Sequence, residues 1–93
     1  MKKSIMNKFR EWLIADYEQR LGHVSKSSVN HRITQINFLL TKPASQYNCF
    51  DRHCLGHSIN KFLEFYVNTT LNRDENSEFI NMMNNISANI NKF

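Results

Sequence analysis

Glycine and proline are scarce in this sequence, and that scarcity narrows the folds open to it. The 93 residues include two glycines and one proline. Sandwiches and barrels of β-strands need such residues at their many turns, whereas helices joined by short loops need few of them. A chain of this length builds one modest hydrophobic core. We therefore expect residues 1–93 to form a single all-α domain, a compact bundle of four to five short helices.

The spacing of apolar residues predicts four amphipathic helices. In each of them, apolar residues recur at intervals of three and four, which is the period of one helix face. The expected N-caps are, in chain order, Ser4, Ser25, Ser58 and either Asn76 or Ser77. Gly22 fits the end of the first helix, and Pro43 prevents the second from continuing.

The apolar stripes predict which side chains form the core. For the third helix they are Ile59, Phe62, Leu63, Tyr66 and Val67, with Leu71 as a further candidate at its end. For the fourth helix they are Phe79, Ile80, Met83, Ile86, Ile90 and Phe93. Residues 41–57 are the least regular stretch, with a short helical turn expected around Phe50–Leu55. Phe38 points away from the stripe of the second helix, either as an exposed contact or as part of a frayed last turn.

Several function classes lack their signatures in this sequence. No apolar run approaches the roughly 18 residues of a membrane span, so we expect no membrane partner. No apolar segment follows Lys2 and Lys3, as it would in a signal peptide. The two cysteines do not make a disulfide framework, which favours a cytoplasmic location. Because no phosphate-binding glycine loop or paired-carboxylate motif occurs, we expect neither enzymatic activity nor a cofactor.

Positive charge is concentrated in the first half of the chain. Residues 1–42 contain eight Lys and Arg against three acids, a charge of +5, whereas residues 43–93 contain four against five, a charge of −1. Such an asymmetry favours one face that meets phosphates or an acidic protein. The simpler interpretation is that the charge only keeps a small protein soluble.

The start of the second predicted helix carries the strongest functional signal. A turn containing Gly22 leads to the Ser25 cap, and small hydroxyl, amide and cationic side chains follow. Helix amides and serines bind phosphate, and Asn, Gln and Arg read base edges. The candidate DNA-binding residues, expected on or beside the solvent face, are Lys26, Ser27, Ser28, Asn30, His31, Arg32 and Gln35. An ordinary capped helix with a solvated polar face is the alternative.

The order of caps and apolar positions also matches a family pattern. The first helix contains Phe9-Arg-Glu-Trp-Leu13. The second has the spacing of Ser25, Ser28, Val29, Ile33, Ile36, Leu39 and Leu40, and the later helices contribute Ser58–Leu63, Phe79, Ile86 and Ile90. From about residue 8 to 93, this pattern resembles the core-binding, SAM-like domain of tyrosine recombinases, or phage integrases.

The resemblance implies a function in DNA recombination or integration. Such a domain grips one side of double-stranded DNA while a separate domain cuts it. The cutting domain uses a His-x-x-Arg motif with a nucleophilic tyrosine, and no His-x-x-Arg occurs in this sequence. The resemblance therefore implies a DNA-binding module without catalysis, acting as a monomer.

Two further functions remain open at the level of sequence. One is a helix-turn-helix transcriptional regulator, since a turn with Gly22 and Ser25 precedes the polar helix; such a protein normally works as a dimer on a palindrome. The other is a small protein-binding module, such as a phage-type inhibitor, whose basic face occupies an acidic or nucleic-acid-binding protein.

A cluster of cysteines and histidines between residues 49 and 57 contains residue types that bind metal ions. If its segment is helical, Cys49, His53 and His57 recur every four residues on one face, and Cys54 lies beside them. These are zinc ligands in type. However, Gly56 disfavours a helix, and structural zinc usually takes paired ligands from two separate elements. We therefore expect no bound metal.

Overall fold

The prediction of an all-α bundle is confirmed. The structure is a computed structural model that describes residues 4–47 and 52–90, and these ranges contain no strand. Their elements are α1 (Ile5–Leu21), α2 (Lys26–Thr41), the single 3-10 turn η1 (Ala44–Gln46), α3 (Arg52–Asn68) and α4 (Arg73–Ile90).

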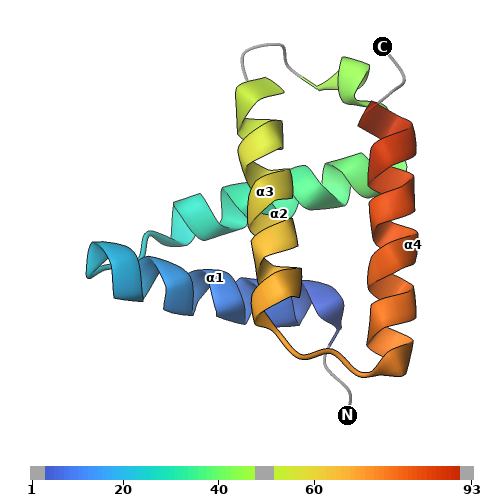
Figure 1. Cartoon of the computed structure of the whole chain (residues 1–93). Helices are drawn as coiled ribbons and strands as arrows, with labels where there is room; N and C mark the ends of the chain where they lie inside the picture. Colours follow the sequence, from blue (N-terminus) through green and yellow to red (C-terminus); the bar gives the residue numbers. More distant parts are fainter. Residues whose placement is uncertain (1–3, 48–51, 91–93) are drawn as a thin grey trace.

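The helices form two crossed hairpins (Figure 1). α1 and α2 run in roughly opposite directions, and so do α3 and α4, which cross the first pair steeply. α2 packs against α1, α3 and α4, most extensively against α4. The end of the first hairpin, where α1 stops and α2 starts, projects beyond α3 and α4. This projecting end, residues 22–28, is referred to below as the hairpin tip.

Local signals set the ends of α1 and the start of α2 as predicted. Ser4 accepts a hydrogen bond from the amide of Asn7. Gly22 ends α1 with a φ of 75°, and its amide donates to the carbonyl of Glu18. A side chain with a Cβ is strained at that φ, so glycine suits the position. Ser25 accepts from the amide of Ser28, which confirms it as the cap of α2.

The predicted start of α3 at Ser58 is wrong. The helix begins at Arg52, so Ser58 lies inside it, and Gly56 does not interrupt it. Ser58 is buried, and its hydroxyl donates to Gln35 of α2. The hydroxyl that suggested a cap therefore serves a contact between helices. The turn expected around Phe50–Leu55 is the start of α3 from Arg52 onward; Phe50 lies outside the described residues.

The predicted cap of α4 is also wrong by four residues or more. The helix starts at Arg73, behind Asn72. Asn72 Oδ1 accepts from the amide of Glu75 at 2.8 Å, and Glu75 Oε1 accepts from the amide of Asn72 at 3.0 Å. This reciprocal pair is a capping box, in which two helix-end amides gain partners. Glu75 is also paired with Lys8, which ties the start of α4 to α1.

The core is built around aromatic side chains from three helices. Phe9 packs against Phe62 with ring centroids 4.9 Å apart, and Phe62 packs against Phe79 at 4.7 Å. These rings and the other buried apolar side chains form one cluster. Phe38 is half-buried in the last turn of α2, where its ring meets that of Tyr47 at 4.9 Å.

The predicted stripes of α3 and α4 are partly wrong. Val67 is 79% exposed, Ile80 52% and Leu63 41%. The buried positions of α3 are Leu55, Ser58, Phe62 and Phe65. They recur every three or four residues, so they share one narrow face, and residues 63 and 67 fall outside it. Phe93 lies outside the described residues.

Candidate nucleic-acid interface

Five of the seven candidate residues are exposed at the start of α2. They are Lys26, Ser27, Ser28, Asn30 and His31. The Oγ atoms of Ser25 and Ser27 lie 2.9 Å apart, so the two hydroxyls share a hydrogen bond. The exposure follows from the fold: the hairpin tip extends past the helices that cover the rest of α2 (Figure 1).

The first turn of α2 offers backbone donors as well as side chains. Ser25 satisfies the amide of Ser28. The amides of Lys26 and Ser27 would need carbonyl acceptors four residues earlier, before the helix begins, so they have no partner within the helix. No acid stands in this first turn to offset the positive end of the helix dipole. The arrangement can therefore accept an anion.

Arg10 of α1 belongs to this surface, although sequence reasoning missed it. Its Nη1 donates to Asn30 Oδ1, which places a guanidinium beside the polar face of α2. The two residues are 20 positions apart, and no local pattern connects them. Only the return of the chain through the hairpin brings them together.

The expectation that Gln35 lies on or beside the solvent face is wrong. Its exposed fraction is 0%, and its Oε1 accepts hydrogen bonds from Ser58 and from Arg32 Nη1. The side chain lies between α2 and α3, where Ser58 supplies the partner that a buried amide needs. Gln35 therefore holds two helices together and cannot read a base.

Arg32 is also turned toward the interior. It is half-buried, and its Nη1 lies 3.1 Å from the carbonyl oxygen of Cys54 and 3.2 Å from Ser58 Oγ. His31 completes the same network from the surface, with Nε2 3.0 Å from Gln35 Nε2. Arg32 thus joins α2 to α3, and it is less accessible than Lys26, which is exposed.

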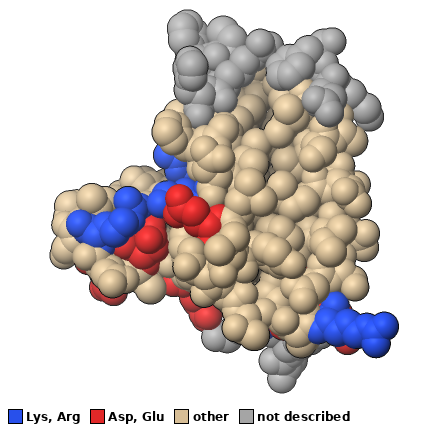
Figure 2. All heavy atoms as spheres, in the orientation of Figure 1, with Lys and Arg blue, Asp and Glu red and all other residues tan. Residues whose placement is uncertain are grey.

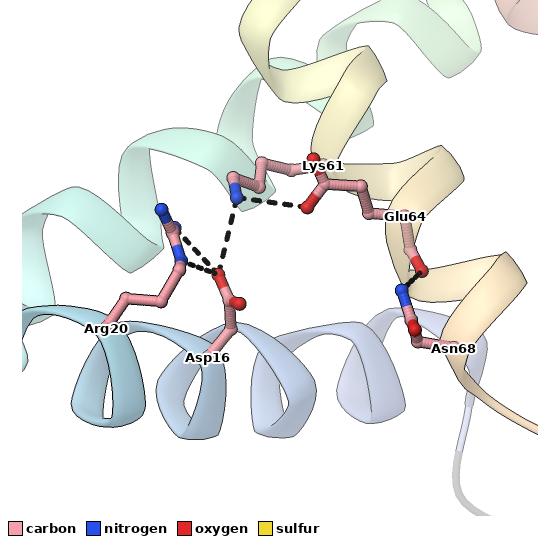
Figure 3. Close-up of polar contacts among 5 residues, drawn as sticks. All are labelled: Asp16, Arg20, Lys61, Glu64 and Asn68. Atoms are coloured by element: carbon pink, nitrogen blue, oxygen red, sulfur yellow. Dashed lines mark hydrogen bonds and ion pairs between the residues drawn. The ribbon is translucent and has the colours of Figure 1, made fainter.

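Many of the other cations are held by carboxylates. Arg20 Nη2 lies 2.8 Å from Asp16 Oδ2, and Lys61 Nζ lies 3.4 Å from the same oxygen, joining α1 to α3 (Figure 3). Lys61 also reaches Glu64 at 3.1 Å. Burial alone would raise the pKa of Asp16, but the hydrogen bonds and positive charges of Arg20 and Lys61 outweigh it and lower that pKa.

The face formed by α3 and α4 carries little charge. Residues 79–90 include no charged side chain. Figure 2 shows a broad uncharged area over these helices, with red and blue atoms interleaved near the end of the α1–α2 hairpin. A further cluster of blue atoms lies at the lower right of this view, near the start of α4, so the part of α3 and α4 that offers a polyanion little attraction is the uncharged area between the two charged regions.

A groove of about 470 Å³ lies between α1 and the start of α2. The apolar part of its lining, called the groove floor below, consists of Ile14, Val24 and Val29. Polar and charged side chains border it, among them Arg10, Glu18 and Lys26. This α1–α2 groove adjoins the candidate residues, and its apolar floor was not expected from sequence.

The Cys/His cluster can be placed only in part. Cys54 is half-buried and His57 is exposed on α3. Cys49 and the side chain of His53 lie outside the described residues. Among the side chains that are described, no three potential ligands gather as a metal site would require. None of the helices in the described ranges has the length and apolar character to cross a membrane.

Comparison with known protein families, with curated proteins and with solved structures finds no significant match.

Proposed function

We propose that this chain is a DNA-binding helical domain without catalytic activity of its own. It binds the phosphates of duplex DNA with the hairpin tip and the adjacent face of α2. The observation that carries the proposal is the joint exposure of Lys26, Ser27 and Ser28 around unpaired helix amides at a projecting end of the molecule. A projecting end can reach a duplex without a clash from α3 or α4.

Each exposed side chain has a role in this arrangement. Lys26 and Arg10 supply positive charge to phosphates, and the hydroxyls of Ser27 and Ser28 donate hydrogen bonds to them. Asn30 and His31 are exposed beyond the first turn of α2, and we assign them to contacts with base edges. Gln35 takes no part, because it is fully buried, and Nη1 of Arg32 is used between α2 and α3.

The resemblance to recombinase core-binding domains supports a role in DNA recombination, as a monomeric cytoplasmic module. The arrangement of α1 and α2 bears on the alternative regulator. The helices of a helix-turn-helix cross steeply, and the second lies free to enter the major groove. Here α1 and α2 are roughly antiparallel, and α2 is packed against three helices. The regulator is therefore the weaker proposal.

The proposal predicts weak and salt-dependent binding. With few cations at the tip, the dissociation constant falls in the range of non-specific contacts, on the order of 10⁻⁴ to 10⁻⁶ M. Each neutralised phosphate releases counterions, so affinity decreases as salt increases. Fluorescence anisotropy of a labelled 20-base-pair duplex, titrated at several salt concentrations, measures both quantities.

The matched pair Lys26→Ala and Lys42→Ala tests the location. Both lysines are exposed and lie at opposite ends of α2, so both variants lose the same charge. We expect Lys26→Ala to weaken binding on every sequence and to reduce the salt slope by about one unit. Lys42→Ala should leave the slope unchanged. Equal losses in the two variants, or no binding at low salt by the folded protein, would refute the proposal.

A further inference from the structure

We propose that the α1–α2 groove binds an acidic segment of a partner protein by burying one apolar side chain of that segment. The site adjoins the proposed DNA surface but differs from it in chemistry. It does not depend on the proposed function, because the groove floor takes no part in phosphate binding.

The floor of the groove suits an aliphatic or aromatic side chain. Ile14 is 37% exposed on α1, and it faces the same hollow as Val24 and Val29 from the other side of the hairpin. The volume of about 470 Å³ falls in the range of binding pockets, which are mostly apolar with a few polar groups at the edge. Burial of an apolar side chain there removes water from both partners.

The border of the groove selects an acidic partner. Arg10 stands on α1 and Lys26 on α2, whereas Glu18 is the acid among the lining residues. The positive end of the α2 dipole adds to the two cations. Carboxylates on either side of an apolar anchor therefore meet opposite charge, which is the complementarity that orients protein partners.

Duplex DNA does not satisfy the same groove. Its backbone presents phosphates and sugars, and it has no projecting apolar side chain to cover Ile14 and Val24. DNA and the acidic segment both contact the cationic border, so they compete for Lys26. Only the acidic segment contacts the apolar floor, so a change in the floor affects that segment alone.

Two peptides and two matched variants test the inference. The probes are a fluorescein-labelled heptapeptide with one central leucine between three acidic residues on each side, and its counterpart with a central alanine. Ile14→Ser removes one of the three apolar side chains of the groove floor, and Val67→Ser removes another aliphatic but more exposed side chain on α3. Circular dichroism establishes that both variants remain folded.

We expect the leucine peptide to bind the full chain about tenfold more tightly than the alanine peptide, because one buried side chain separates them. Ile14→Ser should remove that difference, and Val67→Ser should preserve it. Lys26→Ala should weaken both peptides and DNA, whereas Ile14→Ser should leave DNA binding unchanged.

Equal binding of the two peptides, or an equal effect of the two serine variants, would overturn the inference. Peptide binding without DNA binding would contradict the proposed function alone. DNA binding without peptide discrimination would contradict the groove alone.

Discussion

Ser58 of α3 donates its hydroxyl hydrogen to Oε1 of Gln35 in α2, and both side chains are fully buried. Arg32 Nη1 approaches both of them, at 3.2 Å from Ser58 Oγ and 3.3 Å from Gln35 Oε1. A buried amide without partners destabilises a fold, so these three side chains depend on one another. The result is a polar link within an otherwise apolar core.

Truncating the side chains of this polar link should lower the free energy of unfolding, and the losses from the single variants should not add. We expect Gln35→Ala to lower the free energy of unfolding by about 1–3 kcal/mol, because it leaves buried donors unpaired. Ser58→Ala should cost less, since Arg32 still donates to Gln35. The double variant should cost less than the sum of the two. Urea denaturation of the four proteins gives the coupling energy, and strict additivity would show that the residues act independently.

The two glycines should respond in opposite ways to alanine. Gly56 lies inside α3, and a Cβ there would meet nothing within 4 Å. Gly56→Ala should therefore stabilise the protein by about 0.5–1 kcal/mol, because alanine favours the helix. Gly22→Ala should destabilise it by about 1 kcal/mol, because φ is 75°. Thermal denaturation compares both with the parent, and destabilisation by both would mean that Gly56 has a packing role.

Removal of the α4 cap should identify the true start of that helix. Asn72→Ala should lower the free energy of unfolding by about 0.5–2 kcal/mol, because the amide of Glu75 loses its acceptor. Asn76→Ala, which lies within the helix, serves as the matched control and should change stability little. Chemical denaturation measures the free energy of unfolding of both variants and so shows which of the two residues caps α4. A larger effect at residue 76 would support the cap predicted from sequence.

Asp16 should contribute stability that disappears in acid. Its folded pKa is lower than the ordinary 3.8, so the unfolded chain takes up the proton first as pH falls. The contribution is complete well above pH 3.8 and is lost as pH falls through the folded pKa. Asp16→Asn should thus destabilise by about 1 kcal/mol or less at pH 7, since the pairs are partly exposed.

The pH dependence is measured as the difference between parent and variant in urea melts. That difference should begin to shrink near pH 4 and should disappear below the folded pKa of Asp16, where the aspartate is protonated in both states. Glu78→Gln, which removes an exposed carboxylate on α4, is the control and should show a smaller difference. A constant difference down to pH 2 would mean that the charge of Asp16 does not matter.

Local signals in the sequence determined the helical class and several helix ends. Ser4, Gly22 and Ser25 act on amides and carbonyls within four residues of themselves, so their roles can be read without a fold. The polar start of α2 was predicted for the same reason. The capping box at Asn72 and Glu75 is equally local. However, Asn76 and Ser77, which follow it, are also typical N-cap residues, and they led to the wrong prediction of where α4 begins.

Tertiary structure decided which faces are covered and which side chains meet. Ser58 resembles a cap in sequence, yet its partner is 23 residues away on another helix. Gln35 looks like a solvated side chain until α3 crosses over it, and Arg10 reaches Asn30 only because the hairpin folds back. Such pairings depend on how helices pack across long separations, and a helical period constrains which face is apolar but not which neighbour covers it.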